Sequence, residues 1–142
     1  MNYLVFVSHG ELAPGMHTAV KMMCGEREDV LSTSLKDGMS TEEYRNNFTK
    51  IVEKFDVSND NIVLLADIQG GSPFTIAAEV LGNMGFLDRT TLLCGMNLPM
   101  GVTACIMKDV LTGEELINTI LSESRDAVTH FTVSANLEEE EI

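Results

Sequence analysis

The chain has 142 residues and a mass of 15.6 kDa, with 44% apolar residues and a mean hydropathy of +0.09, which fits one soluble domain. The formal net charge of −13 argues against nucleic acid and anionic membranes as partners, and it suits a partner with a basic docking face. No apolar run approaches the roughly 18–20 residues of a membrane span, and the amino terminus lacks the features of a signal peptide. We therefore expect a cytoplasmic protein.

Short apolar strands alternate with helices along the chain. The apolar, β-branched run at residues 3–7 predicts a strand buried on both faces. Pro14 and Gly25 then mark the first turn and the end of a helix. Capping-box spacing at residues 40–43 and 112–115 predicts the starts of two more helices, the first running to about residue 55 and the second to about 127. The remaining expected elements are strands at 30–35, 62–66 and 90–94, helices at 72–84 and 102–107, and a last short strand at 130–134.

Strands separated by helices predict a three-layer α/β fold, with a mostly parallel sheet covered by helices on both faces. We assign residues 1–136 to this one domain and residues 137–142, rich in Glu, to an acidic disordered tail. The expected strand at 130–134 has no later strand to pair with. A strand of this kind is stable at a sheet edge only if it is paired or covered, either in its own sheet or in that of a second subunit.

Ligand sites in parallel sheets form at the carboxyl ends of the strands, which directs attention to the loops after Val7, Ala66 and Cys94. His9 lies in the first loop, where a neutral imidazole can act as a nucleophile towards phosphorus. Asp67 ends the third strand, where its carboxylate can orient the His9 ring and stabilise positive charge on it. His17 and His130 lack such a position and are expected to be surface or half-buried residues.

The Gly70-Gly71-Ser72-Pro73 segment follows Asp67 closely and predicts a turn leading into a helix, with Ser72 as its N-cap and Pro73 at its first position. The unpaired N–H groups of a helix start bind anions. We therefore expect Gly71 and Ser72 to contact a phosphoryl group.

Basic residues are missing from the three loops: none occurs in residues 1–20, 66–88 or 94–107. A phosphoryl group held there by N–H groups and a hydroxyl is easier to pass on than one held by arginines, which favours a carrier. A dinucleotide fingerprint and a Walker A lysine are absent, and Pro73 removes the N–H that a serine nucleophile elbow would need. The three cysteines form no Cys-x-x-Cys pair, so we expect reduced thiols, no metal site and no cofactor.

Three motifs together make the chain resemble the IIA component of the mannose family of the bacterial phosphoenolpyruvate-dependent sugar phosphotransferase system. They are Val-Ser-His-Gly at residues 7–10, Asp-Ile-Gln-Gly-Gly-Ser-Pro-Phe at 67–74 and Gly-Met-Asn-Leu-Pro-Met at 95–100. Each lies after a predicted strand, and the resemblance extends over about residues 1–135.

The resemblance implies a phosphoryl relay for sugar uptake. His9 would accept phosphate from the histidine-containing phosphocarrier protein and pass it to a IIB component, which serves a membrane sugar-transport complex. Asp67 would orient His9, and Ser8, Gly70, Asn97 and Pro99 would form the walls of the site. The family also implies a homodimer that exchanges its C-terminal edge strand. No linker follows the domain, so IIB is expected on a separate chain.

Two other functions stay open at this point. A phosphatase that uses a His9 phosphoenzyme would need arginines, including one directly before the histidine, where this chain has Ser8. A non-catalytic regulatory module of the same fold would never phosphorylate His9. The sequence does not indicate which sugar is transported.

Overall fold

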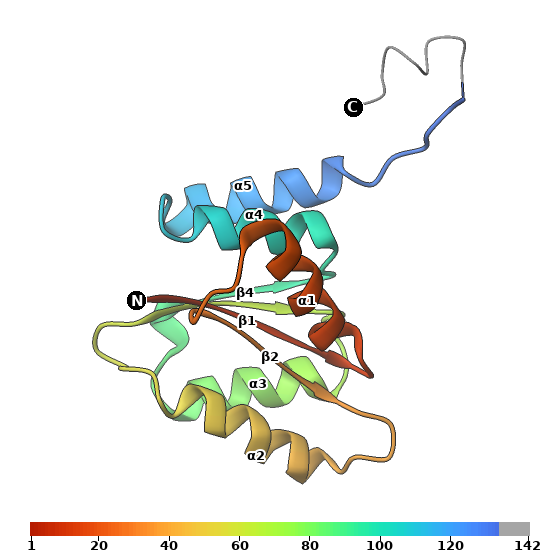
Figure 1. The fold of residues 1–142 in the computed structure, drawn as a ribbon. Helices are drawn as coiled ribbons and strands as arrows, with labels where there is room; N and C mark the ends of the chain where they lie inside the picture. The colour runs from red at the N-terminus through yellow and green to blue at the C-terminus, as the bar shows by residue number, and fades with distance from the viewer. Residues whose placement is uncertain (134–142) are drawn as a thin grey trace.

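The computed structural model describes residues 1–133, so the predicted tail at 137–142 and the end of the predicted domain lie outside the described residues. Figure 1 shows a central sheet between two layers of helices. The strands are β1 (Asn2–His9), β2 (Val30–Leu35), β3 (Asn61–Ala66) and β4 (Thr90–Cys94); the helices are α1 (Leu12–Cys24), α2 (Thr41–Val52), α3 (Ser72–Asn83), the 3-10 turn η1 (Leu87–Arg89), α4 (Leu98–Met107) and α5 (Gly113–Asp126).

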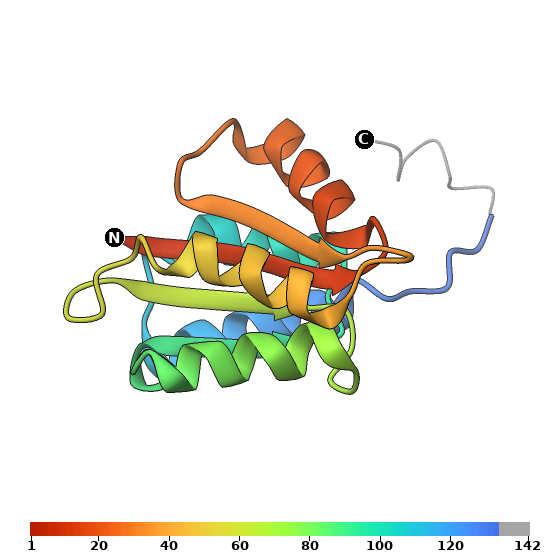
Figure 2. The same ribbon diagram turned by 90° about the horizontal axis from the view of Figure 1, so that it is seen from below.

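The sheet is parallel throughout, with the strand order β2-β1-β3-β4. Helices α1, α4 and α5 cover one face, and α2 and α3 cover the other (Figure 1). Figure 2, from below, shows α2 and α3 in front of the sheet and leaves β2 and β4 at its two edges. The predicted three-layer α/β fold is thus confirmed.

The sheet buries both of its faces because successive side chains of a strand point in opposite directions. Leu4 and Phe6 of β1 pack into the core under α1, α4 and α5. Val5 and Val7 of the same strand pack into the core over α2 and α3. All four side chains are fully buried, which explains why this strand is an uninterrupted apolar run.

Local signals account for several helix boundaries. Ser40 caps α2, since its hydroxyl accepts a hydrogen bond from the Glu43 N–H at 3.1 Å, as the capping box predicts. Gly25 ends α1 with φ of 83°, a conformation that glycine adopts without strain. Thr112 precedes α5 as expected, but its side chain makes no capping hydrogen bond.

The segment expected to form a last strand is irregular in the described chain. Residues 127–133 leave α5 and run away from the body of the molecule (Figure 1), and residues 130–133 form no strand. The side chains of Val128, Phe131 and Val133 are 77%, 62% and 77% exposed. The predicted strand is therefore wrong for the described part of a single chain. No helix of residues 1–133 has both the length and the apolar content to span a bilayer.

Candidate functional site

The loops after β1, β3 and β4 meet at the carboxyl edge of the sheet because these three strands are parallel neighbours. The loop after β4 is bonded to the end of β3: the Gly95 N–H donates to the Asp67 carbonyl and the Met96 N–H to the Ala66 carbonyl, both at 3.1 Å. The end of β1 joins them through its last residue, His9, which bonds to Asp67. The structure therefore brings together the three predicted loops.

His9, the last residue of β1, is held by Asp67 at two points. The backbone N–H of His9 donates to Asp67 Oδ2 at 2.9 Å, and His9 Nδ1 lies 2.8 Å from the same oxygen. The other carboxylate oxygen accepts from the Ile68 N–H at 2.9 Å. The Asp67 side chain is only 11% exposed, whereas that of His9 is 46% exposed and accessible to a partner.

These contacts determine the charge of Asp67 and the tautomer of His9. Burial would by itself raise the pKa of Asp67, but the hydrogen bonds from the His9 backbone, the His9 ring and the Ile68 backbone hold it below its usual value. An ionised carboxylate only accepts hydrogen bonds, so Nδ1 of His9 carries the proton. The lone pair of a neutral ring is then on Nε2.

The Nε2 side of the ring faces the backbone of Gly71. A Cβ atom added at this glycine would lie 2.8 Å from His9 Cε1 and 3.0 Å from Nε2, so the His9 ring would have to shift to accommodate it. Gly71 also has φ of +98°, which favours glycine. The second glycine of the Gly-Gly pair is thus needed for both space and backbone conformation.

Helix α3 starts one residue earlier than the sequence suggests. Gly71 is its N-cap and Ser72 its first residue, so the prediction of Ser72 as N-cap and Pro73 at the first position is wrong by one residue. The positive φ of Gly71 turns the chain into the helix before Ser72, and no side chain caps the helix start. The start of α3 nevertheless lies beside His9, with its first N–H groups free of intrahelical partners.

The predicted wall residues have different surroundings. Ser8 is fully buried, and its hydroxyl accepts a hydrogen bond from the Ala13 N–H at 2.7 Å. This bond ties the end of β1 to the first turn of α1. Gly70 is exposed in the loop before Gly71. Asn97 caps α4 through the Met100 N–H at 2.9 Å and donates to the Ser124 carbonyl at 2.9 Å. Pro99 is in the first turn of α4.

Two features of the site were missed from the sequence. The buried Tyr44 of α2 donates its hydroxyl to the Pro73 carbonyl at 2.7 Å and so fixes the first turn of α3 from below. Leu12, which follows the first loop, and Ile68, which lies in the second loop next to Asp67, are 48% and 53% exposed and add apolar surface at this edge of the sheet. The hydrogen bond of Tyr44 has no signal in the sequence. The apolar surface could have been predicted from the presence of Leu12 and Ile68 among polar loop residues.

The other two histidines do not join the site. His17 Nδ1 lies 2.9 Å from the Ser32 hydroxyl, and burial together with Lys21 lowers the pKa of its ring. His130 is exposed in the irregular segment after α5. Among residues 1–133, no group of three His, Cys, Asp or Glu side chains is arranged to hold a metal ion.

A family model described as "PTS system fructose IIA component" matches residues 3–121. Among curated proteins, the chain is similar to the PTS system mannose-specific EIIAB component of Escherichia coli strain K12, at 25% identity over 126 residues. The match covers 88% of this chain and 38% of the relative, so the chain spans well under half the length of that protein.

Solved structures show the same fold at low identity. The phosphotransferase system component EIIA from Streptococcus agalactiae matches with a TM-score of 0.77 at 23% identity, covering 92% of this chain and 97% of that one. The mannose/sorbose specific IIA subunit from Enterococcus faecalis matches with a TM-score of 0.74 at 23% identity, covering 94% and 96%.

Proposed function

The chain belongs to the phosphotransferase-system IIA family whose model spans residues 3–121, and from this premise we propose that it carries a phosphoryl group on His9 during sugar uptake. The observation that supports His9 most directly is the bond from Nδ1 to Asp67, which leaves Nε2 as the nucleophile at an exposed face. Nε2 is the nitrogen that we propose is phosphorylated.

The proposed step is a displacement at phosphorus. The Nε2 lone pair forms an N–P bond while the bond from phosphorus to the donor's nitrogen breaks, and the donor keeps that electron pair. Positive charge then develops on the His9 ring, and the ionised Asp67, 2.8 Å from Nδ1, stabilises it. The reverse displacement by the acceptor restores the neutral ring.

Gly71 and Ser72 are the proposed phosphate-binding residues. The backbone of Gly71 lies against Nε2, and α3 starts there with free N–H groups. A helix start attracts an anion by roughly 0.3–2 kcal/mol. No Lys or Arg occurs in residues 66–88, so the segment supplies no cation that would retain the group.

The proposed donor is the histidine-containing phosphocarrier protein, and the proposed acceptor is a IIB component that serves a membrane sugar-transport complex. Family membership supports both, and the curated relative is named as a mannose-specific EIIAB component. The exposed Leu12 at the start of α1 and Ile68 next to Asp67 give such partners an apolar contact surface.

We also propose that the chain forms a homodimer through its C-terminal segment. Val128, Phe131 and Val133 are exposed apolar side chains on a segment that leaves its own domain. β4 is at a sheet edge. If the C-terminal segment of a second subunit paired there as a strand, it would cover this edge and bury the exposed apolar side chains.

The test of the relay is an incubation with phosphoenolpyruvate, the general enzyme and the phosphocarrier protein, followed by measurement of the intact mass. The wild type should gain one phosphoryl group, and so should the controls His17→Ala and His130→Ala, because neither residue is in the site. His9→Ala should gain none. Phosphorylation of the His9→Ala protein would exclude His9 as the carrier, and rapid hydrolysis without any acceptor would indicate a phosphatase.

A further inference from the structure

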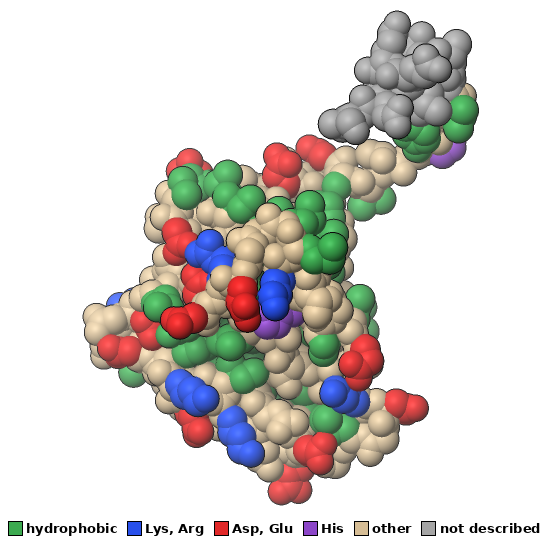
Figure 3. Space-filling view, viewed as in Figure 1, with side chains coloured by type: hydrophobic (Ala, Val, Ile, Leu, Met, Phe, Trp, Pro, Cys, Tyr) green, Lys and Arg blue, Asp and Glu red, His purple; other side chains and the backbone are tan. Residues whose placement is uncertain are grey.

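Strand β2 forms an open edge of the sheet. It pairs with β1 on one side, and no described strand pairs with it on the other. Figures 1 and 3 view the molecule from this side, with α1 above the edge and α2 below it. An open edge presents backbone groups to which an extended segment can bond.

The direction of those groups follows from the pairing with β1. At one end of β2 the Leu4 N–H donates to the Asp29 carbonyl, and at the other the Gly10 N–H donates to the Leu35 carbonyl. Odd-numbered residues of this strand therefore bond to β1, since the bonding direction alternates along a strand. The backbone N–H and carbonyl of Ser32, a partly exposed residue in the middle, point away from the sheet.

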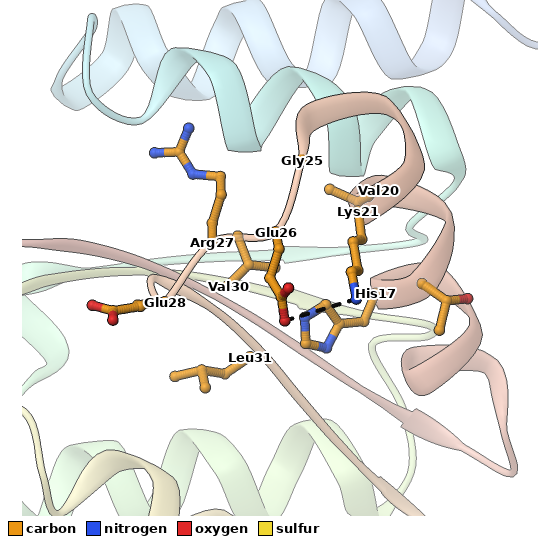
Figure 4. Close-up of a pocket in the computed structure, with 10 residues that line it drawn as sticks. His17, Val20, Lys21, Gly25, Glu26, Arg27, Glu28, Val30 and Leu31 are labelled. Atoms are coloured by element: carbon orange, nitrogen blue, oxygen red, sulfur yellow. Dashed lines mark ion pairs between the residues drawn. The ribbon is translucent and has the colours of Figure 1, made fainter.

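Two hollows lie on opposite sides of this edge and share Glu28 and Leu31. The upper one, about 340 Å³, is between α1 and β2 (Figure 4), with Val20 and Val30 among its lining residues. The lower one, about 370 Å³, is between β2 and α2, and Tyr3 is part of its lining. A strand added at the edge sends alternate side chains to these two sides.

The exposed Glu28 lines both hollows, and they differ in their unpaired basic charge. In the upper one, Lys21 pairs with Glu26 and Arg27 pairs with Asp29. In the lower one, Lys50 and Lys54 are exposed and have no ion pair within residues 1–133; Lys50 is in the last turn of α2, and Lys54 lies in the turn that follows it.

This region also departs from the charge of the rest of the molecule. Residues 21–54 contain six of the nine Lys and Arg residues but only seven of the 22 Asp and Glu residues. Figure 3 shows Lys and Arg side chains distributed over the face at this edge. An acidic segment is therefore repelled far less here than elsewhere on a chain with a net charge of −13.

We propose that the β2 edge binds an extended acidic segment of a partner protein as an added strand. Its apolar side chains enter the upper hollow beside Val20 and Val30, and its carboxylates face Lys50 and Lys54 across the lower hollow. The backbone of Ser32 bonds to the segment, which fixes its position along the edge. This surface lies apart from His9, so the inference does not depend on the proposed relay.

The experiment uses the full chain and a fluorescein-labelled peptide of eight residues in which Val and Glu alternate, followed by anisotropy at physiological salt. The control peptide has the same composition with its Val and Glu residues in two blocks. The alternating peptide should bind at least about tenfold more tightly, because only it separates apolar and acidic side chains onto opposite faces of a strand. Equal binding of the two peptides would contradict the proposal.

Two further peptides test the backbone bonds. Both have the sequence of the alternating peptide. One carries N-methyl groups on its odd-numbered residues, and the other carries them on its even-numbered residues. Only one set of N–H groups faces β2, so one peptide should lose roughly tenfold or more in affinity and the other should lose little. Hydrogen exchange at the Ser32 amide should slow when the unmodified peptide binds. Similar losses for both methylated peptides would exclude strand pairing.

Variants of the chain test the charges. Lys50→Gln with Lys54→Gln should weaken binding roughly fivefold, as expected for two exposed ion pairs. The controls Arg45→Gln and Arg125→Gln, outside both hollows, should not. The double variant should still be phosphorylated at the wild-type rate. Normal peptide binding by the double variant would contradict the proposal. Self-association of the double variant without any peptide binding would also contradict it, because the lysines would then serve only to prevent pairing of the edge with a second copy.

Discussion

At the scale of single residues, the site depends on one carboxylate oxygen. Asp67 Oδ2 accepts from both the backbone and the ring of His9 at 2.9 and 2.8 Å. The two bonds fix the ring relative to its own backbone, so the ordering of the nucleophile is achieved before any partner arrives. Two substitutions test this arrangement.

Asp67→Ala should leave the fold intact and slow phosphoryl transfer by one to several orders of magnitude, because the ring loses both its orientation and its counter-charge. Asp67→Asn is the matched variant, because it keeps a hydrogen-bond acceptor and removes the charge. Its rate of phosphoryl transfer should lie between those of Asp67→Ala and the wild type. The measurement is a rapid-quench time course of phosphorylation. Wild-type rates in both variants would make Asp67 a turn residue only.

Gly71→Ala should impair transfer strongly, since the new methyl group would lie 2.8 Å from His9 Cε1 and the residue would keep φ of +98°. The backbone conformation alone should cost on the order of 1 kcal/mol in the free energy of unfolding. Gly70→Ala is the control, because a Cβ at that position meets nothing within 4 Å. Equal transfer rates for the two variants would contradict the close contact of Gly71 with the ring.

At the scale of elements, an ion cluster around the buried Lys108 joins the end of α4 to the start of β2. Lys108 follows α4 and has a side chain with 0% exposure; its Nζ lies 2.6 Å from Asp29 Oδ2 and 3.0 Å from Asp109 Oδ2. Arg27 binds Asp29 as well, with both bonds at 2.9 Å. Because a buried ammonium needs a counter-charge, the contribution of Asp29 to stability depends on its being ionised.

The cluster predicts a defined loss of stability in acid. The hydrogen bond from Arg27, together with Lys108, lowers the pKa of Asp29 to about 2. The pKa of Asp29 is lower in the folded chain than in the unfolded chain, where it is near 4. Its ionised form therefore stabilises the fold at a pH above about 4, and this stabilisation is lost as the pH falls towards 2. Asp29→Asn should therefore lower the free energy of unfolding at pH 7 by on the order of 2 kcal/mol and flatten its decrease below pH 4.

Urea unfolding between pH 2 and 7 measures this effect. Asp37→Asn is the control, because Asp37 is exposed and its substitution removes the same charge. If both variants lose the same stability, net charge and not the cluster is responsible.

The strands were largely predictable from the sequence, and the contacts between elements were not. The weakly alternating segment at 30–35 and the apolar run at 90–94 coincide with β2 and β4, because alternating and continuous apolar patterns are both typical of strands in a covered sheet. Helix α4 begins at Leu98, four residues before the predicted start, because Asn97 caps it and Pro99 fits its first turn. The 3-10 turn at residues 87–89 was missed altogether.

The site was predictable in its members and less so in its geometry. The position of His9 and Asp67 at strand ends predicted their meeting, which the structure confirms at 2.8 Å. The contact of Gly71 with the ring depends on the backbone path between β3 and α3, and the Tyr44 hydroxyl reaches Pro73 from another helix. Both are non-local, so no pattern of neighbouring residues encodes them.

At the scale of the whole molecule, the segment after α5 lies away from the body of the domain. Residues 127–133 leave α5 with apolar side chains in solvent. Exposed side chains of this type on an extended segment are typical of an interface with another chain. The proposed homodimer would bury them.

Truncation after Val128 should therefore convert a dimer to a monomer, because it removes Phe131 and Val133 along with any exchanged strand. Light scattering at micromolar concentration measures the mass, and the full-length chain is the reference. Phosphorylation of His9 by the phosphocarrier protein should persist in the truncated chain. A full-length chain that is already monomeric would contradict strand exchange.

The two hydrogen bonds that His9 donates to Asp67 Oδ2 have a kinetic consequence for the proposed relay. With Nδ1 and the backbone held by one oxygen, the ring presents a single nucleophilic edge, beside Gly71. Donor and acceptor must then approach the same edge in turn and exclude each other. Transfer should follow a ping-pong scheme, in which an excess of unphosphorylated donor competes with the acceptor and slows the overall flux.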